Sequence, residues 1–290
     1  MAKSGFVPIV LLVLGIFVGK NLNLPSPTPV VRTKIDEPDD IDSAYLVQHY
    51  SGYTFEELTP LIRSWTMVSH QHLQFAWKAV EQVNARGIEG DVVECGVWKG
   101  GNSMMMVFAN MRHNTNRHFW LFDTFEGLPP PTDEKNGARA KNIYTQIDQG
   151  IKSGAVLSRE KTRSIESGKW NFGPKDIVKN NLRYTGYPKD KVHFVQGKVE
   201  ETLSVPSNVP EKIAVLRLDT DWYESTKAEL DIMYDRLQSG GVLILDDFCS
   251  WQGSKTATVE FFKNKLNLDA EAIMKQGKAK GEPCFVYWKP

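Results

Sequence analysis

The sequence is poor in three features that narrow a protein's class: cysteine, an excess of one charge, and a long apolar run. It contains three cysteines, at positions 95, 249 and 284. Their odd number and wide separation match neither a zinc-binding spacing nor a disulfide framework. We therefore expect Cys95 and Cys249, which fall in or beside predicted strand ends, to be buried and chemically inert.

Neither sign of charge is in excess. The 35 Lys and Arg residues equal the 35 Asp and Glu residues, so the formal net charge is zero. Binding to the phosphates of a nucleic acid requires a surplus of positive charge. We therefore expect no nucleic-acid partner, and the composition is otherwise that of an ordinary globular enzyme.

No apolar run reaches the roughly 20 residues of a membrane-spanning helix. The longest, residues 6–19, is uncharged, is interrupted by Pro8 and is flanked by Lys3 and Lys20. Its length suits the core of a signal peptide, but no clear small-residue cleavage site follows. We expect residues 1–20 to be an uncleaved signal anchor that attaches the protein to a membrane. A cleaved secretory signal or an organelle-targeting segment is the alternative.

Residues 21–44 form a linker, rich first in proline and then in acidic residues, and residues 45–290 form the globular domain. Within this domain, apolar strand segments alternate with helical segments. Strands are predicted at 91–95, 118–123, 192–195, 213–219, 241–246 and 284–288, and helices at 55–85, 103–112, 175–184, 225–237 and 254–266. This order predicts an α/β fold with a doubly wound, mostly parallel sheet and helices on both faces.

One long polar segment, 126–175, interrupts the alternation and is punctuated by glycine and proline. Long loops in compact domains are usually lids, binding loops or disordered segments. Because the segment leaves the end of the second strand, we expect a lid over the ligand crevice. A surface insertion without a function is the alternative.

Carboxylates end two neighbouring strands of the predicted sheet. Asp219 and Asp221 follow one strand, and Asp246 and Asp247 follow the next. In an open α/β sheet, ligands bind beyond the carboxyl ends of the strands. Carboxylates gathered there repel one another unless a cation lies between them, and a hard divalent cation prefers oxygen ligands.

A glycine-rich turn follows the first strand and includes Gly96 and Gly100. Its spacing is not the three-glycine fingerprint of dinucleotide-binding proteins. The acidic Glu94 precedes it, which disfavours a pyrophosphate but suits the ammonium and sulfonium charges of S-adenosylmethionine. Asp123 ends the second strand, where an acid accepts hydrogen bonds from ribose hydroxyls. Together these residues indicate an adenosyl cofactor.

Five motifs resemble the macrocin/mycinamicin O-methyltransferase (TylF/MycF) family, in the same order. They are SWTMVS at 64–69, GDVVECGVWKGG at 90–101, LFDTFEGLP at 121–129, LRLDTDWYEST at 216–226 and GGVLILDDF at 240–248. The resemblance covers residues 53–260. It implies a class I, Rossmann-like methyltransferase fold with a seven-stranded sheet, which uses S-adenosylmethionine and magnesium to methylate a sugar hydroxyl.

The resemblance also assigns roles to individual residues. The metal ligands are Asp219, Asp246 and Asp247. The cofactor-binding residues are Glu94, Gly96, Gly100, Ser103, Asp123 and Thr124, with Thr66 and Met67 near the methionine end. The N-terminal apolar segment departs from the soluble members of the family, which leaves location and natural substrate open.

The expected mechanism uses Mg²⁺ chelated by a vicinal diol of the acceptor to lower the pKa of the attacking hydroxyl. Asp219 and Asp221 are the predicted catalytic residues, with Asp221 as the general base. The alternatives are that Asp221 caps the following helix, or that His70 or His72 is the base. Trp98, Trp222 and Tyr223 either line a sugar pocket or anchor the core, and the second is the more common role of such residues.

Two other functions stay open from the sequence. One is a nicotinamide-dependent oxidoreductase on a similar sheet, which the glycine spacing opposes. The other is a non-catalytic, membrane-tethered binding protein, which the clustered carboxylates oppose. The sequence leaves the acceptor undetermined, and whether the chain forms a homo-oligomer is also open.

Overall fold

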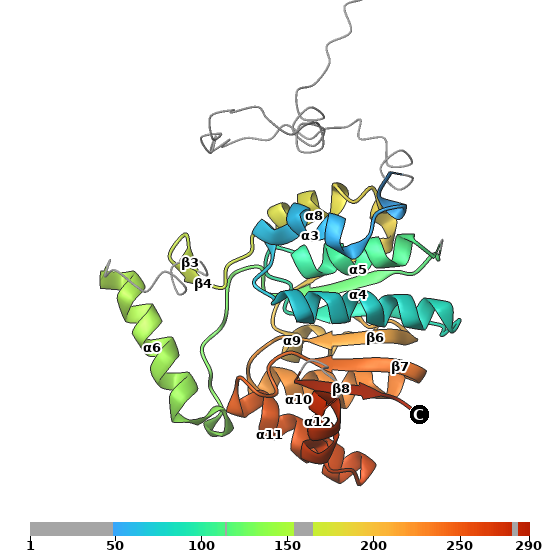
Figure 1. The fold of residues 1–290 in the computed structure, drawn as a ribbon. Coiled ribbons are helices and arrows are strands. Elements are labelled where there is room, and N and C mark those ends of the chain that lie inside the picture. The colour runs from blue at the N-terminus through green and yellow to red at the C-terminus, as the bar shows by residue number, and fades with distance from the viewer. Residues whose placement is uncertain (1–48, 114, 154–164, 280–283) are drawn as a thin grey trace, which may run out of the picture. The chain divides into compact units, whose positions relative to one another are not determined.

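The structure is a computed structural model that describes residues 49–113, 115–153, 165–279 and 284–290 (Figure 1). The predicted N-terminal anchor, residues 1–20, and the linker, residues 21–44, lie outside these ranges. Over the described ranges, no helix is both long and apolar enough to cross a membrane. The membrane anchor therefore stays a prediction from the sequence.

The centre of the fold is a sheet with the strand order β5-β2-β1-β6-β7-β8. Its first five members run parallel, and β8 runs antiparallel to β7. The strands are β1 (Asp91–Cys95), β2 (Phe119–Asp123), β5 (Val192–Gln196), β6 (Ile213–Leu218), β7 (Leu237–Leu245) and β8 (Phe285–Trp288). The predicted α/β class with a mostly parallel sheet is confirmed.

The strand number differs from the seven that the family resemblance implied. In the described part of the chain, this sheet has six strands. The stretch between β7 and β8 instead forms α11 (Gln252–Phe261), a π-helical turn (η6, Phe262–Leu266) and α12 (Ala270–Ala279). For the described residues the expectation of seven strands is therefore wrong.

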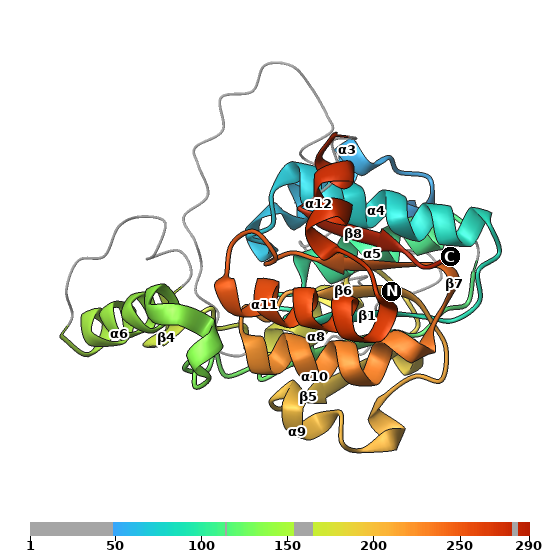
Figure 2. The same ribbon diagram turned by 90° about the horizontal axis from the view of Figure 1, so that it is seen from below.

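Helices cover both faces of the sheet (Figures 1 and 2). One face packs against α3 (Phe55–Ile62), α4 (His70–Ala85), α5 (Gly101–Met111) and α8 (Lys175–Arg183), and the other against α10 (Tyr223–Met233), α11 and α12. Side chains alternate between the two cores along each strand: Val92 enters the first, and Val93 and Cys95 enter the second. The chain therefore buries its strands on both sides, as the continuous apolar runs predict.

Local signals place the helix starts. Thr54 and Glu57 form a reciprocal capping box at α3, and Ser69 caps α4. All of α5 is buried, which explains its run of methionines. The short elements are α9 (Val199–Thr202) and the 3₁₀ turns η1 (Arg63–Trp65), η2 (Glu134–Asn136), η3 (Lys189–Lys191), η4 (Pro206–Asn208) and η5 (Tyr234–Arg236).

The predicted lid segment contains α6 (Gly137–Ser153) and a small hairpin of β3 (Ile165–Glu166) and β4 (Lys169–Trp170). These elements lie beyond the carboxyl-terminal edge of the parallel strands (Figures 1 and 2). Whether the segment acts as a lid stays a prediction.

The insertion is fastened to the body through the first turn of α10. Asn136 Oδ1 accepts the backbone N–H of Tyr223 at 2.7 Å, and its Nδ2 donates to Glu224 Oε2 at 2.6 Å. Glu224 also accepts the backbone N–H groups of Thr132 and Asp133. A Cβ on Gly253 would lie 2.0 Å from Asn136 Oδ1, so the glycine is what lets the asparagine reach the helix.

The cysteines differ from expectation. Cys249 and Cys284 form a disulfide, and Cys95 is free and buried. The antiparallel pairing of Leu245 with Phe285 brings the two cysteines together, with their Cα atoms 6.0 Å apart. The expectation that Cys249 is an inert thiol is therefore wrong, because this pairing depends on a strand contact that spacing in the sequence does not reveal.

We expect Asn136→Ala to loosen the insertion. The change leaves the buried N–H of Tyr223 without its acceptor, at a cost of about 1–3 kcal/mol. Limited proteolysis should cut the substituted protein within residues 126–175 faster than the wild type. Asn142→Ala, an exposed position on α6, is the control and should not change the rate. Equal cleavage of all three proteins would show that Asn136 does not hold the insertion.

Candidate active site

The register of the sheet arranges the candidate site residues in two rows across neighbouring strands, both on the same face of the sheet. Glu94 pairs with Arg217, and Arg217 pairs with Ile244. Two residues further along each strand, on the same face, come Gly96, Asp219 and Asp246. Because parallel strands end at one edge, the carboxylates that the sequence places at strand ends are brought together there.

Arg217 lies between the two rows and is only 2% exposed. Its Nη1 donates to Glu94 Oε1 at 2.8 Å, and its Nη2 contacts Asp219 Oδ2 at 2.9 Å and Asp246 Oδ1 at 3.0 Å. Sequence reasoning missed this residue. The available signal was a single cation inside an apolar strand, because a buried charge needs partners of opposite sign.

Glu94 faces inward rather than into a cavity. It is 1% exposed, and besides Arg217 it accepts hydrogen bonds from Asn102 Nδ2 at 2.7 Å and from the hydroxyl of Ser103. Both donors lie in the first turn of α5. Burial raises the pKa of Glu94, and the nearby Arg217 opposes that shift. Two predicted cofactor residues, Glu94 and Ser103, therefore bind each other.

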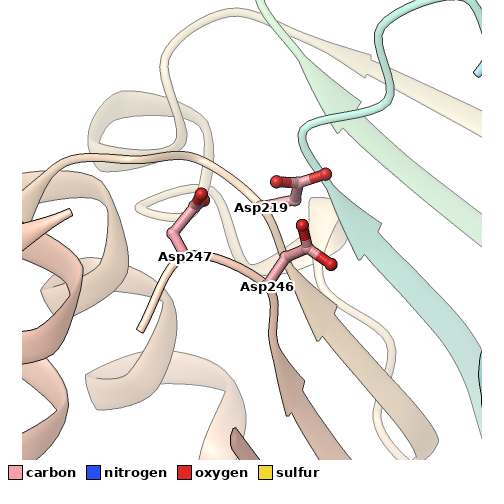
Figure 3. Close-up of side chains that lie close together, drawn as sticks. All are labelled: Asp219, Asp246 and Asp247. Carbon is pink, nitrogen blue, oxygen red and sulfur yellow. The ribbon is translucent and has the colours of Figure 1, made fainter. Parts of the chain in front are cut away.

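Asp219, Asp246 and Asp247 form the predicted metal cluster (Figure 3). Each offers a carboxylate oxygen, and these three oxygens lie within 4.8 Å of one another. Asp246 Oδ1 is also 3.0 Å from Nδ1 of His72, in the first turn of α4. Three converging carboxylate oxygens are a donor set suited to a hard divalent cation.

The charges of the cluster are poorly balanced. Burial raises the pKa of Asp219 to about 6, although Arg217 opposes the shift. Burial and the charges of Asp221 and Asp219 raise the pKa of Asp247 well above its usual range. For Asp246, Arg217 and His72 outweigh the effect of burial and lower the pKa to about 2. One guanidinium therefore leaves excess negative charge, which a cation would offset.

Asp221 has an unusual backbone conformation, with φ at +67°. Its N–H donates to Asp247 Oδ2 at 3.0 Å, and burial together with Asp219 raises its pKa to about 7. The N-cap of α10 is Trp222, so the alternative that Asp221 caps this helix is wrong. Strain of this kind persists where surrounding contacts hold it, and it is concentrated at functional sites.

A pocket opens beside these carboxylates. Six of the predicted site residues line it: Met67, Gly96, Asp123, Thr124, Asp219 and Asp221. Thr66, Gly100, Glu94, Ser103, Asp246 and Asp247 are not among its lining residues. Residues after β5 were missed and also line it, namely Gly197, Lys198, Val199 and Glu200. Their position directly after a parallel strand was the available signal.

Asp123 holds the glycine-rich turn in place. Its Oδ2 accepts the N–H groups of Val97 at 2.7 Å and Trp98 at 3.0 Å, and its Oδ1 accepts that of Phe125 at 2.7 Å. Gly96 passes so close to the next strand that a Cβ would lie 1.8 Å from the carbonyl oxygen of Asp219. The turn beside the pocket is thus fixed from both sides.

The remaining candidates have different surroundings. His70 lies 3.5 Å from Glu56 at the surface, so only His72 of the two histidines reaches the carboxylates. Trp98 lines the pocket, and its buried indole nitrogen has no hydrogen-bond partner among the described residues. Trp222 and Tyr223 are buried, and the Trp222 indole donates to the carbonyl of Pro129. These two residues are core anchors, although Trp222 also lines the pocket.

This sheet, with its pocket beyond the carboxyl ends of the strands, is that of the class I methyltransferases. The solved structure of the O-methyltransferase NovP superposes with a TM-score of 0.58 at 23% identity, covering 78% of this chain and 93% of that one. The chain belongs to the macrocin O-methyltransferase (TylF) family, whose model matches residues 56–280.

Two relatives have assigned reactions. The first is 8-demethyl-8-(2,3-dimethoxy-alpha-L-rhamnosyl)-tetracenomycin-C 4'-O-methyltransferase of Streptomyces olivaceus, 34% identical over 205 residues that cover 69% of this chain and 70% of the relative. The second is mycinamicin III 3''-O-methyltransferase of Micromonospora griseorubida, 29% identical over 63% of this chain and 65% of the relative. The family resemblance is confirmed, and the protein is an O-methyltransferase rather than an oxidoreductase or a non-catalytic binding protein.

Gly96→Ala tests the close approach between β1 and β6. The new Cβ meets the Asp219 carbonyl, and φ at +82° is itself unfavourable for alanine. We expect the thermal unfolding midpoint to fall by several degrees, since about 1 kcal/mol corresponds to roughly 2–4 °C at this size. Affinity for S-adenosylhomocysteine should fall at least about tenfold, or 1.4 kcal/mol.

The control for this experiment is Gly52→Ala, because a Cβ at that position has open space around it. It should change neither quantity. A Gly96→Ala protein with wild-type stability and wild-type affinity would contradict the proposed constraint.

Proposed function

We propose that the protein transfers the methyl group of S-adenosylmethionine to a hydroxyl of a sugar or glycoside, with Mg²⁺ held by Asp219, Asp246 and Asp247. The observation that carries this proposal is that two half-sites lie side by side at one edge of the sheet. The donor half is the pocket beside the glycine-rich turn, and the acceptor half is the group of carboxylates at residues 219, 221, 246 and 247. The pocket lined by Gly96 and Asp123 suits the donor, and it opens onto Asp219 and Asp221. Both halves of a methyl transfer then lie within reach of each other.

The donor half is built for an adenosyl group without a phosphate. Asp123 points its carboxylate at the glycine-rich turn, where negative charge disfavours a pyrophosphate. Trp98 and residues 197–200, which follow β5, also line this pocket. Met67 lines the same pocket and is exposed, which supports its assignment to the methionine end of the donor.

The acceptor half fits a hard dication. Three carboxylate oxygens converge within 4.8 Å. Burial, together with the neighbouring carboxylates, raises the pKa values of Asp219 and Asp247, and a cation bound between them would favour their charged forms. When bound, Mg²⁺ acts as a Lewis acid toward the acceptor oxygens and orients them. Arg217 and His72 hold Asp246 in place for that purpose.

Asp221 is the group we assign to proton removal. It lines the pocket next to Asp219, and the hydrogen bond from its N–H to Asp247 fixes its position. Alignment of the attacking oxygen with the methyl group and the sulfonium supplies much of the rate acceleration in such reactions. The fixed turn at residues 219–221 provides that alignment on the acceptor side.

The sugar acceptor is supported by the relatives. The name of one relative specifies a rhamnosyl derivative, and the other is a mycinamicin 3''-O-methyltransferase. A vicinal diol on a pyranose presents two oxygens at a spacing suited to chelation of one ion. We therefore assign to this protein a sugar or glycoside acceptor with adjacent hydroxyls.

The test is a set of binding and rate measurements with Mn²⁺ as the metal probe. The wild type should bind both S-adenosylhomocysteine and Mn²⁺. Asp246→Asn should weaken Mn²⁺ binding by more than the roughly 10- to 100-fold that loss of an outer-shell partner costs. Asp221→Asn keeps a residue tolerant of positive φ; it should retain both affinities and lower methyl transfer to a rhamnoside panel by roughly 10²–10⁴-fold.

Asp231→Asn is the control, since Asp231 is an exposed partner of Lys227 on α10. It should leave every readout unchanged. A wild-type protein that binds no S-adenosylhomocysteine would overturn the donor assignment, and one that binds no Mn²⁺ would overturn the metal assignment. Methyl transfer that continues in the presence of EDTA would contradict the proposed need for magnesium. Absence of methyl transfer to every rhamnoside tested would contradict the proposed sugar acceptor.

We also propose that the chain works in an oxidising compartment, delivered there or anchored there by its N-terminal apolar segment. The disulfide between Cys249 and Cys284 supports this, because disulfides persist mainly in secretory or extracellular environments. Alkylation of thiols in intact cells, followed by mass measurement, should label neither cysteine, and the protein should fractionate with membranes or secreted material. Soluble cytosolic protein with both thiols labelled would contradict the proposal.

A further inference from the structure

One buried residue connects the two half-sites. Arg217 is 2% exposed and contacts Glu94 below the glycine-rich turn, and Asp219 and Asp246 in the metal cluster. The side chains of its three carboxylate partners are 1%, 26% and 21% exposed for Glu94, Asp219 and Asp246. A guanidinium enclosed by three carboxylates determines where their oxygens point.

In both Asp219 and Asp246, the protein contacts one of the two carboxylate oxygens. Arg217 Nη2 contacts Oδ2 of Asp219 and Oδ1 of Asp246, and His72 contacts that same Oδ1 of Asp246. Within the described part of the chain, each of these aspartates thus has one oxygen that contacts protein donors and a second oxygen that could bind a metal. Donors that hold one oxygen of a ligating carboxylate orient it for the metal and tune affinity.

The opposite side of the guanidinium is equally constrained. Nη1 donates to Oε1 of Glu94, which also accepts from Asn102, while Ser103 donates to Oε2. The first turn of α5 therefore fixes Glu94, and Glu94 fixes Arg217. An arginine suits this place because its planar fork meets several carboxylates at set angles, whereas a lysine offers a single ammonium.

We propose that Arg217 is a positioning residue that sets the metal-binding geometry of Asp219 and Asp246 and links it to Glu94. Through this link, Glu94, which lies below the glycine-rich turn, influences the affinity for the metal. Neither Arg217 nor Glu94 is itself a metal ligand. This inference depends on the proposed metal site. It identifies residues that orient the metal ligands without binding the metal themselves.

The decisive variant is Arg217→Lys, because it keeps the charge and removes the fork. We expect Mn²⁺ affinity, measured by electron paramagnetic resonance, to fall by roughly 10- to 100-fold. Glu94→Gln, which keeps the size of the side chain, should lower Mn²⁺ affinity by at least several-fold. Because this second variant leaves the arginine in place, it keeps the inference testable if Arg217→Lys does not fold.

The matched control is Arg117→Lys. Arg117 is also buried, but it donates to Asn84 and to backbone carbonyls near Gly90, away from the carboxylate cluster. Loss of its contacts should lower the unfolding midpoint without changing Mn²⁺ affinity. A fall in Mn²⁺ affinity equal to that of Arg217→Lys would show a general effect of destabilisation and overturn the inference.

Rate measurements separate positioning from a structural role. In Arg217→Lys, the Mg²⁺ concentration that gives half-maximal activity should rise, and saturating Mg²⁺ should restore much of kcat. Folded Arg217→Lys and Glu94→Gln proteins that bind Mn²⁺ within twofold of the wild type would overturn the inference and leave the proposed function intact. Absence of Mn²⁺ binding by the wild type would overturn the metal assignment itself, and with it this inference.

Discussion

The ion-pair cluster around Arg217 is the interaction on which the rest of the site depends. Burying charges is costly unless each finds partners in good geometry, and removal of one partner leaves the others uncompensated. The parallel register of β1, β6 and β7 supplies those partners, and the first turn of α5 completes them. The sheet edge is therefore preorganised before any ligand arrives, and the same contacts that stabilise the fold orient its carboxylates.

Most of the fold could be predicted because buried parallel strands carry a strong signal. The strand cores of the central sheet fall where their continuous apolar runs place them, with boundary differences of at most four residues. The insertion could not be predicted in the same way. Helix α6 and the β3–β4 hairpin are partly polar, and contacts from Asn136 and Glu224 hold the insertion on the body. The disulfide was missed for a related reason, since it depends on the antiparallel return of β8.

The site was predicted in its position more than in its internal arrangement. Strand ends predicted that Asp219, Asp246 and Asp247 lie close together, because the carboxyl edge of a parallel sheet follows from topology alone. The direction of a side chain does not follow from topology. Glu94 and Ser103 belong to the right turn, yet they bond to each other and not to the pocket. Arg217 was missed because two of its partners, Glu94 and Asp246, belong to or directly follow neighbouring strands that are distant in the sequence.

The reach of Asn136 across the molecule has a consequence for motion. A helix cap normally belongs to the residues just before the helix, but here the acceptor for the N–H of Tyr223 lies 87 positions earlier in the chain. If the insertion left the body, Tyr223 and Glu224 in the first turn of α10 would lose these hydrogen bonds. This helix follows Asp219 and Asp221 directly. We therefore expect opening of the insertion to be coupled energetically to the turn that carries Asp219 and Asp221.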